Sequence, residues 1–116
     1  MVDLTVDRSN RVTAQEWDQR TKLAAVYRAF ARMGWDDLIY THISARVPGP
    51  EAHFLINPFG LMYEEVTASN LVKIDLAGEK VEADEPNEIN YAGYIIHSAV
   101  HEALENIHCV VHLHTD

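Results

Sequence analysis

Short connections between strand-like segments constrain this fold more than any other feature of the sequence. The predicted elements, in chain order, are a helix at 13–33, strands at 39–47, 53–56 and 71–76, a helix at 91–104 and a strand at 108–114. Most connections are too short to contain a crossover helix, which favours antiparallel pairing. The pattern predicts an α/β or α+β domain.

The first helix has the clearest boundaries. Thr13 and Glu16 have the spacing of a capping box, in which each side chain satisfies a backbone N–H of the first turn. Gly34 stands where a left-handed residue would end the helix. Residues 1–12 are polar and are predicted to form an N-terminal arm, followed by one domain at 13–116.

The charge of the chain excludes some partners. The 116 residues carry 9 Lys and Arg against 18 Asp and Glu, which gives a net charge of -9. An acidic surface repels phosphate backbones, so no nucleic-acid partner is expected. There is no apolar run long enough for a membrane span and no signal-peptide pattern. With one cysteine, Cys109, the expected location is cytoplasmic.

His112 and His114 are the sharpest local feature. Side chains at i and i+2 of a strand share a face, so these two imidazoles can share one divalent metal at about 2.0–2.1 Å each. Solvated or hydrogen-bonded histidines are the more common outcome of this pattern alone. Three protein ligands are usual in catalytic zinc sites. The sequence leaves the third open among His97, His108, Glu88, another subunit and residues that this chain lacks.

The remaining candidate residues have simpler interpretations. His97 and His101 share a face of the second helix, and packing on the sheet is favoured over metal binding. His42 has no partner evident in the sequence. Cys109 is predicted to be a buried small hydrophobic residue rather than a nucleophile. The acidic run at 79–88 is predicted to be a solvated loop.

Six segments together resemble the N-terminal part of the class II aldolase/adducin family. They are GW at 34–35, IYTHISARV at 39–47, HFLINPFGL at 53–61, EVTASNLVK at 65–73, HSAVH at 97–101 and CVVHLHT at 109–115. The residues of these segments are similar to those of the adducin head and its bacterial relatives. The resemblance implies a three-layer α/β/α fold with a central, mainly antiparallel sheet flanked by helices. It also implies a homotetramer, and a later part of the domain that lies beyond Asp116.

The resemblance implies a metal-dependent chemistry. In the family's enzymes, the two histidines of an HxH strand, here His112 and His114, and a third histidine further along hold Zn²⁺ or another divalent metal. The metal polarises a carbonyl or enediolate oxygen, and an acidic residue on the preceding helix moves protons. The implied function is that of a class II aldolase, an aldehyde-lyase acting on a small hydroxy-carbonyl or sugar-derived substrate.

The chain departs from the family pattern at three places. The acidic position, four residues before His97, falls on Gly93. The phosphate-binding Gly-Asn-x-Ser appears as THIS at 41–44, and Thr-Pro-Ser/Thr-Gly appears as NPFG at 57–60. The third metal ligand would lie beyond Asp116. These departures support two alternatives, namely a non-catalytic, adducin-head-like scaffold or oligomerisation domain, and a fragment without activity of its own.

Overall fold

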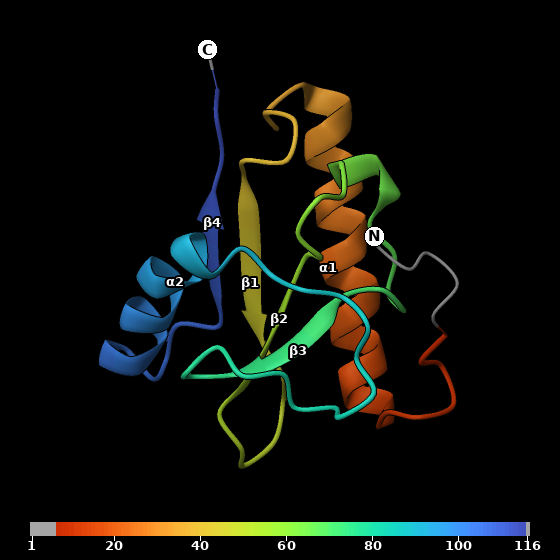
Figure 1. Ribbon diagram of the computed structural model, residues 1–116, viewed down its shortest axis with the longest axis vertical. Helices are drawn as coiled ribbons and strands as arrows, with labels where there is room; N and C mark the ends of the chain where they lie inside the picture. The colour runs from red at the N-terminus through yellow and green to blue at the C-terminus, as the bar shows by residue number, and fades with distance from the viewer. Residues whose placement is uncertain (1–6, 116) are drawn as a thin grey trace.

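Two helices and one four-stranded sheet make up this chain in the computed structural model, which describes residues 7–115 (Figure 1). The elements are α1 (Ala14–Met33), β1 (His42–Arg46), β2 (His53–Ile56), the 3₁₀ helix η1 (Tyr63–Glu65), β3 (Val72–Asp75), α2 (Tyr91–Ala103) and β4 (Cys109–His112). The strand order is β3-β2-β1-β4, and every neighbouring pair is antiparallel. The predicted antiparallel sheet with two helices is confirmed. Residues 1–6 of the predicted arm, and Asp116, lie outside the described residues.

Helix α1 begins and ends at the predicted residues, but only one half of the predicted capping box forms. The Thr13 hydroxyl accepts a hydrogen bond from the Glu16 backbone N–H at 3.1 Å, and Gly34 ends the helix with φ of 72°. The Glu16 carboxylate instead accepts hydrogen bonds from Arg20 Nε at 2.8 Å and Lys73 Nζ at 2.7 Å. The buried Arg20 and the partly buried Lys73 therefore take the place of the backbone N–H as partners of this carboxylate.

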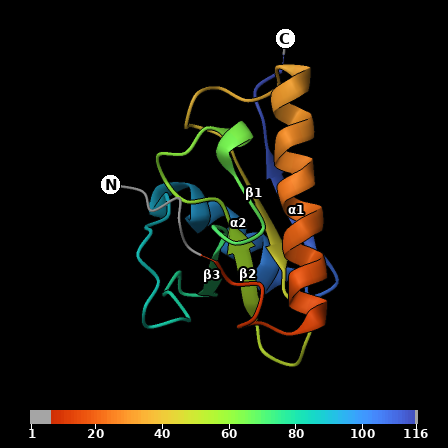
Figure 2. The same ribbon diagram turned by 90° about the vertical axis from the view of Figure 1, so that its right-hand side faces the viewer.

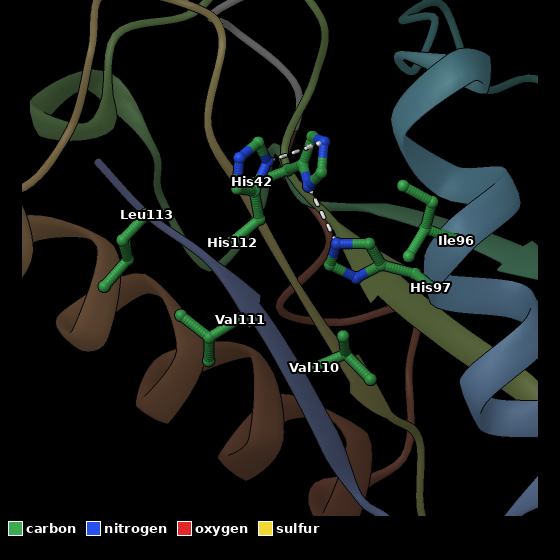
Figure 3. Close-up of a pocket in the computed structure, with 7 residues that line it drawn as sticks. All are labelled: His42, Ile96, His97, Val110, Val111, His112 and Leu113. Atoms are coloured by element: carbon green, nitrogen blue, oxygen red, sulfur yellow. Dashed lines mark hydrogen bonds between the residues drawn. The ribbon is translucent and has the colours of Figure 1, made fainter.

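Helix α1 runs along one face of the sheet (Figure 2), and the two faces carry different residues. On β1, Ile43 and Ala45 belong to the apolar core beneath α1, which also contains Leu23 and Tyr27 of that helix. The alternate β1 residues point to the opposite face, toward α2 (Figure 3). This alternation follows from the two-residue period of a strand, and it gives one face of β1 to hydrocarbon and the other to polar side chains.

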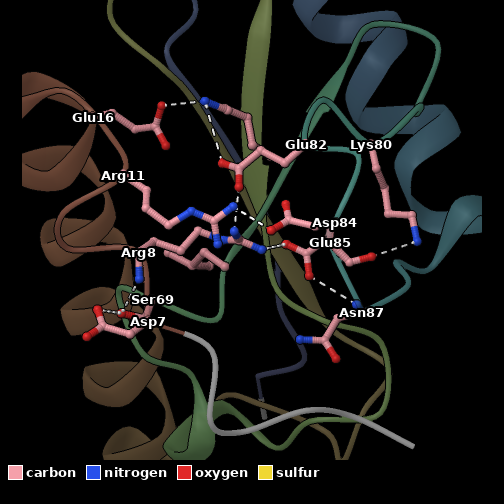
Figure 4. Close-up of polar contacts among 12 residues, drawn as sticks. Asp7, Arg8, Arg11, Glu16, Ser69, Lys80, Glu82, Asp84, Glu85 and Asn87 are labelled. Atoms are coloured by element: carbon pink, nitrogen blue, oxygen red, sulfur yellow. Dashed lines mark hydrogen bonds and ion pairs between the residues drawn. The ribbon is translucent and has the colours of Figure 1, made fainter.

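The acidic run at 79–88 is more ordered than predicted (Figure 4). Arg8 is fully buried, and its guanidinium donates to the carboxylates of Glu82 and Glu85. Glu85 is 6% exposed, and Lys80 pairs with Glu88 at 2.7 Å. The prediction of a solvated loop is wrong for Glu85, because this segment supplies the counter-charges that allow Arg8 to be buried.

The helices of the described part of the chain do not combine the length and the apolar character that crossing a membrane requires.

Candidate metal centre

Three imidazoles gather where β1 and β4 lie side by side. In the register of these strands, His42 is directly opposite His112. The ring centroids of His42 and His112 are 4.8 Å apart, and those of His112 and His114 are 5.0 Å apart. Figure 3 shows the rings of His42 and His112 next to each other, with His97 reaching toward them from α2. The pairing of two strands that are distant in sequence therefore assembles this cluster.

A chain of buried hydrogen bonds holds the Nδ1 side of the His42 ring. His42 Nδ1 lies 2.8 Å from His97 Nε2, and His97 Nδ1 lies 2.7 Å from the Ser44 hydroxyl oxygen. The same hydroxyl lies 2.9 Å from His101 Nε2. Each contact requires one donor and one acceptor, so the tautomers of these imidazoles are coupled. The predicted packing of His97 and His101 on the sheet is therefore correct, and it fixes the orientation of His42.

Burial keeps these histidines neutral. Desolvation, together with the neighbouring His42, His101 and His112, lowers the pKa of His97 to about 3. Desolvation is also the main cause that lowers the pKa values of His42 and His101 below 6.5. The neutral imidazole, with one nitrogen lone pair free, is the form that binds metals.

Gly93 leaves the space that the His42 ring occupies. A Cβ built at position 93 would lie 2.1 Å from His42 Nε2 and 2.5 Å from His42 Cδ2. Real Cβ atoms do not approach other atoms so closely, and both atoms belong to a ring that is held by His97. Glycine at the position aligned with the family's acidic residue is therefore a steric requirement of His42.

The rings of the predicted ligands His112 and His114 lie next to each other, with centroids 5.0 Å apart, although β4 ends at His112 and not at His114 as predicted. His114 Nδ1 is 2.8 Å from the Asp37 carboxylate, and both side chains are about half exposed. Metal-binding histidines commonly use their second nitrogen in such a contact with a carboxylate. No group of three His, Cys, Asp or Glu side chains within residues 7–115 is already arranged around one metal position. The donor chemistry of the pair fits a divalent ion as part of a site.

The other predicted ligands have different partners. Both ring nitrogens of His97 are engaged by His42 and Ser44. Glu88 pairs with Lys80. His108 is exposed, and its backbone carbonyl bonds to the N–H of Arg46, at the opposite end of β1 from His42. His97 thus contacts the cluster only as a support of His42, and neither Glu88 nor His108 joins it.

Cys109 is exposed, which contradicts the prediction of a buried residue. It lies on β4, which among the described strands has one sheet neighbour, β1. The apolar face that the alternation of this strand suggested is thus only partly covered among the described residues.

A cavity of about 360 Å³ adjoins the histidines. Its lining residues come from β1, α2, β4 and the residue after β4, and they are His42, Ile96, His97, Val110, Val111, His112 and Leu113. The volume is at the lower end of the range for small-molecule pockets. Apolar walls with a few imidazoles at one side can exclude water around a small polar molecule.

The aligned phosphate-binding segments use their polar side chains elsewhere. The Asn57 side-chain oxygen accepts a hydrogen bond from the buried Tyr27 hydroxyl at 2.9 Å. Ser44 is held by His97 and His101. Phe59 is 45% exposed and has no polar side-chain atom to offer. Ser44 and Phe59 are therefore not free to donate to a phosphate, and Asn57 is engaged only through its acceptor oxygen.

His42 is the site residue that sequence reasoning missed. Its partner His112 lies far away in the sequence, and no local pattern reports which residues face each other across two strands. A weak signal existed in Gly93, because glycine is unfavourable inside a helix and indicates a close approach by another group.

Curated relatives are similar over most of this chain. A "Putative aldolase class 2 protein" of Pseudomonas aeruginosa is 60% identical over 112 residues, which cover 97% of this chain and 42% of that protein. Alpha-adducin of Mus musculus is 52% identical over 97 residues, which cover 83% of this chain and 13% of that protein. The chain therefore spans less than half the length of each of these relatives.

Solved structures share the fold. An aldolase II superfamily protein from Pseudomonas syringae has a TM-score of 0.88 at 57% identity, covering 91% of this chain and 43% of that one. An L-fuculose 1-phosphate aldolase from Glaciozyma antarctica has a TM-score of 0.83 at 31% identity, covering 97% of this chain and 47% of that one. The model of the class II aldolase and adducin N-terminal domain matches residues 21–116. With a match over this much of its length, the chain belongs to the class II aldolase and adducin family.

Proposed function

We propose that this chain carries the metal-binding part of a class II aldolase-type protein, an aldehyde-lyase acting on a small hydroxy-carbonyl or sugar-derived substrate. The observation that carries the proposal is the position of His112 at a cavity of about 360 Å³, with the ring of His114 next to it. The similarity to an L-fuculose 1-phosphate aldolase supports the same class of reaction.

The residues have separate tasks in this proposal. His112 and His114 would hold Zn²⁺ or another divalent ion, which supplies Lewis-acid polarisation of a carbonyl oxygen when bound. Asp37 orients the ring of His114 through its 2.8 Å contact. Ile96, Val110 and other apolar residues of the cavity exclude water from the reacting groups.

The substrate class follows from the donors that are already engaged. Ser44 is tied into buried hydrogen bonds with His97 and His101, and Phe59 offers no donor. A phosphate held by the Ser44 hydroxyl would have to break the contacts that hold these two histidines, which leaves the Asn57 amide as the side-chain donor of these segments. A small hydroxy-ketone or hydroxy-aldehyde without a phosphate therefore suits this site better than a sugar phosphate.

The proposal also covers the domain bounds, the layers of the fold, the oligomeric state and the location of the protein. We place the domain at residues 13–116, after an arm at 1–12, and assign it the family's three-layer α/β/α arrangement. We also propose that the protein is a homo-oligomer, a tetramer by analogy with its family, and that it acts in the cytoplasm. An exposed apolar surface on α2 supports the self-association.

Metal content and turnover test the function together. The protein is purified without chelator, its metal content is measured, and aldehyde release is assayed across hydroxy-ketones and sugar phosphates. We expect a bound divalent ion and turnover that are both lost in His112→Ala and both kept in His108→Ala, which changes an exposed histidine at the other end of β1. A protein with neither metal nor turnover would contradict the proposal.

A non-catalytic scaffold is the second candidate. Gly93 removes the family's acidic side chain, and 52% identity to alpha-adducin over 97 residues favours this alternative. Under it, the protein would assemble into a defined oligomer after complete removal of metal and would release no aldehyde. Metal-dependent turnover in the same preparation would exclude it.

A further inference from the structure

We propose that His42 is a metal ligand of this protein, binding through Nε2 beside His112. This inference rests on the proposed function, because it concerns the same metal site, but it assigns a ligand outside the HxH strand. The ion would then be shared by β1 and β4 rather than held by β4 and the residues after it.

The separation of two nitrogen atoms is the first argument. His112 Nδ1 and His42 Nε2 lie 3.5 Å apart, which is long for a hydrogen bond between two ring nitrogens. Two nitrogens that bind one tetrahedral zinc at about 2.05 Å each would lie about 3.4 Å apart. The observed distance is close to that of two ligands of one ion.

The spacing of the rings agrees with this geometry. Imidazoles arranged tetrahedrally around one zinc have ring centroids about 5 Å apart. The centroids of His42 and His112 are 4.8 Å apart, and those of His112 and His114 are 5.0 Å apart. His114 has a half-exposed side chain, and its Nδ1 is held by Asp37, so its Nε2 is the nitrogen left for a metal.

The surroundings of His42 are those of an oriented ligand. Its Nδ1 is bonded to His97, so its Nε2 is the nitrogen left for another partner. His97 is held in turn by the Ser44 hydroxyl. Histidine ligands of metals are normally fixed by such a contact of the second ring nitrogen.

Gly93 gives the ligand atom its space. The atom that a Cβ at position 93 would approach most closely, at 2.1 Å, is Nε2 of His42 itself. Any other residue at this position would push that nitrogen away from His112. Gly93 thus leaves space for Nε2, the ring nitrogen of His42 that is not bonded to His97.

Binding of Zn²⁺ to the metal-free protein tests this assignment. Isothermal titration calorimetry is applied to the wild type, to His42→Ala and His42→Gln, to His112→Ala and to His108→Ala as the matched control. We expect the affinity to fall at least tenfold in both His42 variants and in His112→Ala, and to remain unchanged in His108→Ala. The shift of the thermal midpoint on adding Zn²⁺ is measured in parallel, so that a variant with lower stability is compared with its own metal-free form.

X-ray absorption of the zinc-loaded wild type gives a second readout that needs no variant. Three or more imidazoles per ion, together with the losses above, would support the assignment. Unchanged affinity in the His42 variants with loss in His112→Ala would overturn it and leave the proposed function standing. A wild type that binds no Zn²⁺ would overturn both.

Discussion

Gly93 has no side chain because the ring of His42 already occupies the space beside it. The two residues lie on different elements, α2 and β1, and each restricts what the other can be. Because of this coupling, Gly93 at the family's acidic position and His42 belong together. The site lacks a carboxylate on α2 and has an imidazole on β1 in the space beside Gly93.

A double-mutant cycle measures this coupling. We expect Gly93→Ala to lower the free energy of unfolding by about 1–3 kcal/mol, because the added methyl group overpacks the His42 ring. In the His42→Ala background the same change should be neutral or stabilising, since alanine favours a helix more than glycine does. Urea denaturation of the four proteins provides the test, and additive effects would contradict the coupling.

The buried histidines predict a dependence of stability on pH. The pKa of His97 is about 3 in the folded protein, against an ordinary value of 6.5. Between these values the unfolded chain binds a proton that the folded chain does not. Stability should therefore fall as the pH drops below 6.5, with a slope of up to about 1.4 kcal/mol per pH unit for this residue.

Urea denaturation in the presence of a chelator, at pH values from 7 to 5, checks this dependence. His97→Gln cannot bind the proton, so its stability should change less steeply with pH than that of the wild type. His108→Gln, at an exposed histidine, is the control and should keep the wild-type slope. Equal slopes in the wild type and His97→Gln would contradict the prediction.

The sequence predicted the site residues only where their pattern is local. His112 and His114 are two residues apart, so strand alternation alone placed them on one side. The contact between His42 and His112 depends on how β1 and β4 align, and that alignment is set by the packing of the whole sheet. The two-residue period of a strand therefore predicts the pair His112 and His114. It cannot predict that His42 lies beside them on the neighbouring strand.

At the level of elements, helix α1 is joined to the sheet by a buried carboxylate. Glu16 is 3% exposed and accepts hydrogen bonds from Arg20 of the same helix and Lys73 of β3. Asp18 and Lys22 form an ion pair with the same spacing on the exposed side of α1. The helix thus offers a buried pair and an exposed pair for direct comparison.

We expect Glu16→Gln to lower the free energy of unfolding by about 3–5 kcal/mol, because the buried Arg20 and the partly buried Lys73 lose their nearest counter-charge and keep only the more distant Glu82, at 4.0 and 3.8 Å. Asp18→Asn should change it by less than about 1 kcal/mol, since that pair is exposed to water and salt. Chemical denaturation of both variants measures the difference. A cost for Glu16→Gln as small as that for Asp18→Asn would show that water compensates these cations.

The limits of the helices were predictable and the ion pairs were not. Thr13 and Gly34 are local signals that act within one turn, and α1 begins and ends where they indicate. Lys73 pairs with Glu16, and Arg8 pairs with Glu85, from distant segments, so local patterns predicted a capping role for Glu16 and a solvated role for Glu85. In both cases an ion pair with a residue distant in the sequence determines the position of the carboxylate.

At the scale of the whole molecule, an apolar surface remains uncovered among the described residues. Ile95 and Ile96 of α2 are 69% and 67% exposed. Exposed apolar groups of this kind mark contact surfaces in soluble proteins. This surface lies next to the cavity, to which Ile96 contributes.

We expect the protein to self-associate through this surface and Ile95→Lys to weaken the association, because a charge there resists burial. Met33→Lys changes a residue of α1 that is 57% exposed and serves as the control. Sedimentation velocity over a range of concentrations measures both. Equal association of the two variants would assign the contact to another face.

The position of β4 at the rim of the sheet has a consequence for dynamics. Among the described strands it is bonded on one side only, to β1. Such a border strand opens more readily than a central one, so its amide protons should exchange with deuterium early. An ion held jointly by His42 and His112 would cross-link the border to its neighbour. Slower deuterium uptake along residues 109–112 after zinc addition would then show that zinc has bound, through the backbone amides and without any measurement on the histidine side chains.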